Sequence, residues 1–211
     1  MARPTTDLEA GREALLDHVE ALIAQRGGVS ITLAELAAAA NMSPANLYRF
    51  FENKEALYQA VAERWFAPKV RAMEEVLASD LPIRQKFHAF YARRLAMTLA
   101  DYARDPALFR SYIELGHQHM DIVRGFIDLA DHFLAQLIAE AIAEGYFAGF
   151  EIDAAVSLVN LMVQTFCDPE LVVMLVHSVS EEKLAIVIDT IFDGMRADRP
   201  TNVHRLRETA R

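Results

Sequence analysis

Cysteine is almost absent from this sequence: Cys167 is the only one among 211 residues. A single cysteine excludes a disulfide within the chain, so a reducing cytoplasm is the compartment that we expect. The amino-terminal stretch MARPTTDLEAGREALL lacks the apolar core of a secretion signal. The most apolar stretch, residues 156–179, is interrupted by polar side chains and lacks the roughly 20 uninterrupted apolar residues of a membrane span. We therefore predict a soluble, cytoplasmic protein.

Glycine and proline are also scarce, at 8 and 7 residues, whereas 53% of the residues are hydrophobic. Long alternating runs of β-branched residues are absent, and alanine and leucine dominate. This composition predicts an all-α protein with enough apolar residues for a buried core. We expect a small head of three helices followed by a larger carboxy-terminal helical bundle. The predicted helices number about nine and cover residues 7–26, 33–40, 44–50, 54–77, 82–104, 106–117, 121–144, 152–166 and 181–195.

Positive charge is the third scarcity, because the formal net charge is −9. Residues 1–54 hold five Lys and Arg residues against seven Asp and Glu residues. Phosphate contacts need cations, so this balance argues against a general affinity for nucleic acid. Any DNA binding must depend on local geometry with few phosphate contacts.

Local signals for helix ends cluster in residues 32–51. Thr32 and Glu35 have the spacing of a capping box, and Ser43 followed by Pro44 is a typical helix start. Asn41 between them tolerates the left-handed backbone of a tight turn. Two helices this close, joined by such a turn, predict a helix-turn-helix that exposes its second helix to a DNA major groove. The outward side chains of that helix are Ala45, Asn46, Arg49 and, in part, Tyr48.

The stretch TLAELAAAANMSPANLYRFFENKEALYQAV resembles the DNA-binding domain of tetracycline-repressor-type (TetR) regulators. That family shows a pattern of the kind S-P-x-x-L-Y-x-x-F-x-x-K-E-x-L. One position departs from it, because Asn41 stands where the family usually has glycine. The pattern is matched here by Ser43, Pro44, Leu47, Tyr48, Phe51, Lys54, Glu55 and Leu57.

The resemblance implies DNA contacts that fit the chemistry of the side chains. Asn46 can pair bidentately with adenine, and Arg49 can pair with guanine or take a phosphate. Hydroxyls at helix starts favour phosphate, and Lys54 adds a charge-assisted contact. The residues assigned to DNA are Thr32, Ser43, Pro44, Ala45, Asn46, Tyr48, Arg49 and Lys54.

Each of these residues also has a structural interpretation without DNA. Thr32 and Ser43 cap helices in any case, Tyr48 could pack on the first helix, and an exposed Arg49 is usually solvated. No metal site or cofactor is predicted: His117 and His119 point to different helix faces, and no further ligands accompany His117.

The resemblance further implies a domain that binds a small molecule and dimerises. We therefore assign residues 1–54 to DNA binding, 55–198 to ligand binding and dimerisation, and 199–211 to a flexible tail. Aromatic side chains in a helical bundle can line an apolar pocket, although for any one of them a place in the core is the commoner outcome. The candidate ligand-binding residues are Trp65, Phe87, Tyr91, Arg94, Phe109, Tyr112, His117, Phe126 and Gln164.

Two late helices, over residues 152–166 and 181–195, are more apolar than surface helices should be. Paired with their symmetry mates they would make a four-helix dimer interface; burial within one chain is the alternative. The candidate interface residues are Val156, Asn160, Val163, Leu184, Val187, Ile188 and Ile191.

Together these features predict a ligand-responsive homodimeric regulator, most simply a repressor released from a palindromic operator by a small apolar or aromatic molecule. A helical adaptor that uses the same surface to dock a protein is the alternative. An enzyme is not predicted, because G-x-S-x-G, phosphate-loop and H-E-x-x-H motifs are absent. Cys167 precedes His177 by ten residues but has no third catalytic partner.

Overall fold

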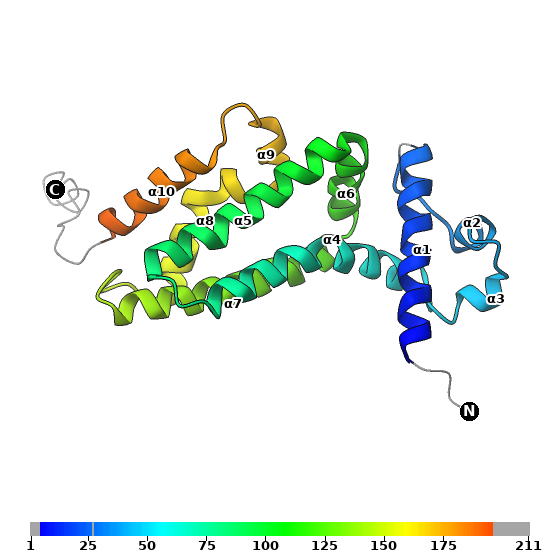
Figure 1. Cartoon of the computed structure of the whole chain (residues 1–211), viewed down its shortest axis with the longest axis horizontal. Coiled ribbons are helices and arrows are strands. Elements are labelled where there is room, and N and C mark those ends of the chain that lie inside the picture. The colour runs from blue at the N-terminus through cyan, green and yellow to red at the C-terminus, as the bar shows by residue number, and fades with distance from the viewer. Residues whose placement is uncertain (1–4, 27, 196–211) are drawn as a thin grey trace, which may run out of the picture. The chain divides into compact units, whose positions relative to one another are not determined.

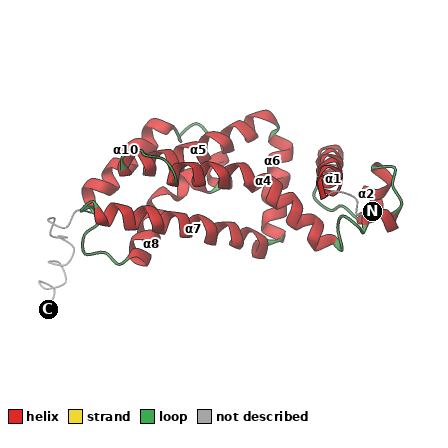
Figure 2. Ribbon diagram, turned by 60° about the horizontal axis from the view of Figure 1, so that its bottom comes forward, coloured by secondary structure: helices red, strands yellow, loops and turns green. Residues whose placement is uncertain are grey.

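The computed structural model describes residues 5–26 and 28–195, and this part of the chain holds ten α-helices and no β-strand (Figure 1). Figure 2 shows the same helices joined only by loops and turns. The all-α prediction is confirmed, whereas the predicted tail, residues 199–211, lies outside the described residues. The helices are α1 (Thr5–Arg26), α2 (Leu33–Ala39), α3 (Pro44–Leu47), α4 (Lys54–Leu77), α5 (Ile83–Arg104), α6 (Pro106–Gln118), α7 (Met120–Ala143), α8 (Ile152–Cys167), α9 (Pro169–Met174) and α10 (Glu181–Gly194).

Most helix ends follow the local signals in the sequence. The Asn53 side chain accepts a hydrogen bond from the backbone N–H of Ala56 at 2.7 Å, just where α4 begins. The Asp105 carboxylate accepts from two backbone N–H groups in the first turn of α6. Gly145 follows α7 with φ at 89°, a left-handed conformation that glycine adopts without strain.

Two details differ from the expected helices. Helix α3 ends at Leu47 instead of near residue 50, because the N–H groups of Arg49 and Phe50 bond to carbonyls three residues back and form turns. A tenth helix, α9, follows the break after α8. It forms because the Asp168 carboxylate caps it, with Pro169 at the first helical position.

The chain forms two compact units. Unit 1 contains Met1–Pro68 and Ala100–Ile127, and unit 2 contains Lys69–Leu99 and Asp128–Arg211. The sequence-based boundary at residue 54 follows the DNA-binding motif, whereas these units follow packing. Unit 1 therefore includes α6, which no local sequence signal links to the helix-turn-helix.

Each unit has its own hydrophobic core. In unit 1, Leu15 and Val19 of α1 pack with Leu36, Leu47 and other buried side chains, and α6 adds Tyr112 and Leu115. In unit 2, the rings of Phe87, Phe147 and Phe192 lie 4.9 to 5.8 Å apart at the centre of a cluster built from α5, α7, α8 and α10. Such interlocked aromatic rings favour a well-defined packing.

Candidate nucleic-acid interface

A tight turn joins α2 to α3 and sets the direction of α3. Asn41 occupies it with φ at 51°, as its place in the sequence predicts, and Met42 donates its N–H to the Ala37 carbonyl at 2.8 Å. Leu36, Ala37 and Leu47 are buried where the helices meet. The side of α3 opposite Leu47 consequently faces away from the core of unit 1.

Helix α1 lies close to the end of this motif. A Cβ atom placed on Gly11 would lie 2.6 Å from the Phe50 ring, so the absence of a side chain lets α1 and the segment after α3 approach. Phe51, which follows, is fully buried in the same core. These contacts fix the helix-turn-helix on α1 without using the outer side chains of α3.

The outer face of α3 and of the residues that flank it is exposed, and its most exposed polar side chains belong to the flanking residues. Ser43, Pro44, Ala45 and Arg49 are exposed, and Tyr48 retains 56% of its surface in contact with solvent. The tyrosine ring therefore is not part of the core, although packing on α1 would have been an ordinary use for it. A large aromatic side chain in this position is available for contact with another molecule.

Asn46 and Arg49 lie next to each other on this face. The Arg49 guanidinium donates to the Asn46 side-chain oxygen at 3.4 Å, and Asn46 is half-buried. The Ser43 hydroxyl caps the helix by accepting from the Asn46 N–H at 3.3 Å. The two side chains that the sequence assigns to base recognition thus form one patch, with the Asn46 amide nitrogen left to donate elsewhere.

Thr32 is exposed, but its hydroxyl is engaged. It accepts from the Glu35 N–H at 3.2 Å and donates to the Glu35 carboxylate at 2.8 Å, and that carboxylate also receives the Thr32 N–H. The predicted capping box is therefore present. The Thr32 backbone bond, with Arg26 and the Thr32 hydroxyl, lowers the pKa of Glu35 to about 2, so a carboxylate charge stands beside this helix start.

Lys54 lies in the first turn of α4, at the end of the motif. Its ammonium group is 5.1 Å from the centre of the Tyr58 ring, in cation–π geometry. The Tyr58 hydroxyl donates to the Val29 carbonyl, between α1 and α2, at 3.3 Å. Lys54 is only half-buried, so this contact orients its charge without enclosing it.

Acidic side chains of α1 are held by Arg64, which the sequence analysis did not single out, and by Tyr112, which it assigned to ligand binding instead. The Arg64 guanidinium of α4 lies 2.5 to 3.7 Å from the carboxylates of Glu13, Asp17 and Glu20. The Tyr112 hydroxyl of α6 donates to Glu20 at 2.5 Å. The spacing of the three acids, which places them along one side of α1, was the signal that a cation would be needed there.

Five of the predicted ligand-binding residues belong to unit 1, and four of them are aromatic. Trp65 stacks on Tyr112 with centroids 5.2 Å apart and meets the edge of Phe109 at 5.8 Å, while Phe126 stacks on Phe66 at 4.1 Å. His117 is exposed on α6. The structure therefore brings the aromatic members of this group together.

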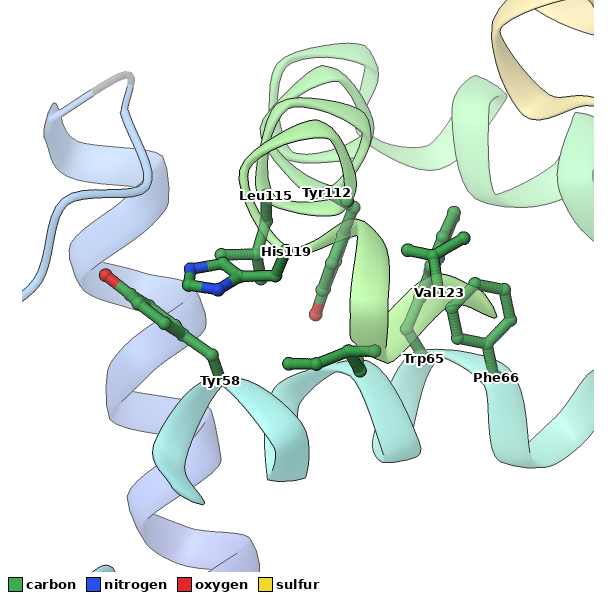
Figure 3. A pocket seen from close by; sticks show the side chains of 10 residues that line it. Tyr58, Trp65, Phe66, Tyr112, Leu115, His119 and Val123 are labelled. Carbon is green, nitrogen blue, oxygen red and sulfur yellow. The ribbon is translucent and has the colours of Figure 1, made fainter. Parts of the chain in front are cut away.

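A small cavity that is partly open to solvent lies beside these rings. In Figure 3, Tyr58 and His119 face each other at one end, and Phe66 lies beside Val123 at the other. The cavity contains only two of the predicted residues, Trp65 and Tyr112. Its full lining is Tyr58, Ala62, Trp65, Phe66, Tyr112, Leu115, Gly116, His119, Ile122 and Val123.

The other four predicted ligand-binding residues belong to unit 2. Phe87 is fully buried in the aromatic core, and Tyr91 is buried beside the ring of Phe90. Arg94 is half-buried, with its guanidinium 5.6 Å from the Phe90 ring centre, and Gln164 is exposed on α8. Phe87 thus occupies a core position, which was the alternative for each aromatic residue.

The residues predicted for a dimer interface lie mostly inside unit 2. Val163, Leu184, Ile188 and Ile191 are buried in its core, and Val156 and Val187 pack against that core. The Asn160 side chain donates to Asp131 at 2.7 Å within the same chain. The exposed apolar residues of the same two helices are different ones: Ile152, Leu158, Leu161, Met162 and Ile186.

Neither metal ligation nor thiol catalysis is supported by the described part of the chain. Within it, no three or more His, Cys, Asp or Glu side chains are grouped so that they could hold a metal ion. Burial raises the pKa of the Cys167 thiol, which is the opposite of what a nucleophilic thiolate requires, and His177 is exposed on a different segment.

Comparisons with known proteins agree with this geometry. Residues 15–61 match the model of the bacterial regulatory proteins of the tetR family, and residues 84–188 match the tetracyclin repressor-like C-terminal domain. The fold and the α2–α3 motif define a helix-turn-helix DNA-binding transcriptional regulator. The chain belongs to the TetR family, whose members are regulators and not enzymes.

Individual relatives match either a short part of the chain or most of the chain at low identity. Over 59 residues, 28% of each chain, the sequence is 46% identical to an uncharacterized HTH-type transcriptional regulator of Mycobacterium tuberculosis. SmeT, the repressor of the Stenotrophomonas maltophilia multidrug efflux pump SmeDEF, is 19% identical over 89% of this chain and 91% of its own, with a TM-score of 0.65. A TetR family transcription regulator from Marinobacter aquaeolei VT8 is 18% identical over 90% and 97%, with a TM-score of 0.61. At these identities the structures show the shared fold.

Among the helices of the described residues, none is both long enough and apolar enough to cross a bilayer.

Proposed function

We propose that this TetR-family regulator is a repressor that binds a palindromic operator as a homodimer and is released from it by a small apolar or aromatic molecule. The observation that carries the DNA-binding part is the outer face of α3, where Ser43, Ala45, Tyr48 and Arg49 are exposed while Leu47 alone is buried. A helix this short, held by one buried leucine, presents nearly all of its side chains to a partner.

The roles on DNA follow from the side chains and their positions. Asn46 and Arg49 form the base-recognition patch, since an amide suits adenine and a guanidinium suits guanine. Tyr48 and Ser43 contact the sugar-phosphate backbone through their hydroxyls, and Lys54 adds a cation. Thr32 contributes less than the sequence suggests, because the carboxylate of Glu35 already holds its hydroxyl. With so few cations, binding should depend only weakly on salt.

A gel shift with the DNA upstream of the protein's own gene tests this proposal. We expect a retarded complex, weakened by Asn46→Ala and by Tyr48→Phe but not by Gln25→Ala, which alters an exposed side chain of α1. A helical adaptor would give no shift even at low salt, and that result would exclude operator binding.

Support for a homodimer comes from the outer face of α8. Leu158, Leu161 and Met162 are exposed at the three- and four-residue spacing of one helix face, and α10 adds Ile186, which is 66% exposed. Exposed apolar side chains that gather on one face mark an interface more often than chance. We therefore place the dimer contact on these residues, instead of on the buried residues that the sequence suggested.

The effector would act by shifting a population between two conformations. Helix α4 begins with Lys54 at the DNA-binding motif, and its residues after Pro68 belong to unit 2, so it is one element through which ligand binding would alter the motif. A ligand that favours a wrong spacing of the two motifs lowers operator affinity by as much as it prefers that state. A ligand that binds tightly yet leaves operator affinity unchanged would disprove this mechanism.

A further inference from the structure

The core of unit 2 contains a buried polar group that the packing does not use. The Tyr91 hydroxyl has less than 1 Å² of exposed surface and no hydrogen-bond partner among the described residues, whereas every other buried side-chain polar atom in that part of the chain has one. Leaving a buried donor unsatisfied destabilises a fold by about as much as a hydrogen bond is worth. A bound ligand could supply the hydrogen-bond acceptor that this hydroxyl lacks within the described part of the chain.

Ionisable groups of three helices act electrostatically on this hydroxyl. Burial raises the pKa of Tyr91 well above its usual value; Cys167 and Asp131 add to that effect, and Arg94 opposes it, so all three lie within electrostatic range. Arg94 is on the same helix, α5, three residues further along and hence on the same face. Asp131 belongs to α7 and Cys167 to α8.

Of the two charged side chains near the hydroxyl, Asp131 has a hydrogen-bond partner and Arg94 has no ion-pair partner among the described residues. The Arg94 guanidinium lies over the Phe90 ring and forms no ion pair with the described side chains. Asp131, by contrast, accepts a hydrogen bond from the Asn160 amide at 2.7 Å. Burial raises the pKa of the Cys167 thiol, so this group stays neutral and adds no competing anion.

From these contacts we infer that the effector is an apolar organic acid, whose carboxylate is held by the Arg94 guanidinium and the Tyr91 hydroxyl. A carboxylate accepts from both donors at once, and charge-assisted bonds of this kind are the stronger ones. Arg94, Asp131 and Asn160 are half-buried, so the cluster extends from the core to the surface of unit 2. This inference rests on the proposed function and specifies the chemistry of its effector.

The test uses two sets of compounds, each an acid, an amide and an amine on the same apolar skeleton. The aromatic set is phenylacetate, phenylacetamide and phenethylamine. The aliphatic set is octanoate, octanamide and octylamine. For each compound, the thermal shift of the full-length chain and the release of operator DNA are measured. We expect the acid of at least one set to bind about tenfold or more tightly than its amide and its amine. A preference for the amine, or no preference for either acid, would overturn the inference.

Four variants locate the site. Arg94→Met and Tyr91→Phe should each weaken acid binding by about tenfold or more, while Asp131→Asn should strengthen it by removing a nearby negative charge. Arg93→Met is the matched control, because Arg93 is exposed, precedes Arg94 and pairs with Glu75 instead. Retained acid preference in Arg94→Met would also overturn the inference.

Operator binding by the unliganded chain is measured in the same titrations. If that binding is absent, the proposed function fails. If it is present and the acids have no advantage, only the assignment of the effector fails.

Discussion

The surfaces at helices α3 and α8 differ in the polarity of their exposed side chains. Helix α3 buries one leucine, Leu47, and the residues that flank it expose polar side chains, whereas α8 buries the stripe of Ala155, Val159 and Val163 and exposes a second apolar stripe around Leu161. A polar exposed face suits base edges and phosphates, which offer directional hydrogen bonds. An apolar exposed face suits another apolar surface, where buried area determines affinity.

The two regions also differ in the interactions that hold them in place. The α2–α3 motif is shaped by individual hydrogen bonds, such as those of Thr32 with Glu35 and of Asn46 with Ser43. Helix α8 is held mainly by contacts of its apolar stripe within the core of unit 2. Changes to the exposed apolar face should therefore have large effects on association, and single polar contacts in unit 1 should have small effects on stability.

The largest expected effect is on the exposed face of α8. Leu161→Glu would place a charge in the proposed dimer interface, and we expect it to weaken dimerisation by about 3 kcal/mol, roughly a hundredfold in the dissociation constant. Sedimentation equilibrium measures this change. Met174→Glu is the matched control, because Met174 on α9 is equally exposed, at 68%, outside that face. If the two variants dimerise equally well, α8 is not part of the interface.

A smaller effect is expected at the contact between α6 and α1. Tyr112→Phe removes the hydrogen bond to Glu20 while keeping the ring stacked on Trp65, and should cost about 1 kcal/mol of unfolding free energy. Chemical denaturation measures it, with Tyr102→Phe as control, since the Tyr102 hydroxyl only receives a long bond, 3.5 Å, from Arg110. An unchanged midpoint for Tyr112→Phe would show that this contact adds nothing.

The turn between α2 and α3 offers a backbone test. Asn41 has a left-handed backbone, so Asn41→Ala should cost about 1 kcal/mol, while Asn41→Gly should be neutral or slightly stabilising. Thermal unfolding of the three proteins distinguishes these outcomes. If alanine is as stable as glycine here, the turn does not need its left-handed residue.

The smallest effect is the pH dependence of the capping box. The Thr32 backbone N–H, together with Arg26, holds the pKa of Glu35 at about 2 in the folded chain, below the usual 4.5. A lowered pKa means that the contribution of Glu35 to stability is complete above about pH 4.5 and is lost as the pH falls towards 2. NMR titration of the Glu35 carboxyl carbon measures the midpoint. A midpoint near the usual 4.5 would contradict the capping box.

The regions also differ in how far the sequence could predict them. The motif at Thr32–Phe51 depends on caps and turns whose signals lie within a few residues, so its helices and exposed side chains were predictable. Helix α8 is apolar on two faces, and periodicity cannot tell which one meets the core of its own chain; hence Val163 was assigned to an interface and is buried. The Tyr112–Glu20 bond joins residues 92 positions apart and left no local trace.

The most direct test of the account compares Asn46→Ala with Lys54→Ala on operator and unrelated DNA over a range of salt concentrations. If α3 recognises bases, Asn46→Ala should lose about 1 to 3 kcal/mol of operator affinity while its affinity for unrelated DNA stays unchanged. Lys54→Ala should weaken both alike and reduce the salt slope by about 2 per dimer, one for each lost phosphate contact. Equal losses on both DNAs for Asn46→Ala would contradict base recognition by the exposed face of α3.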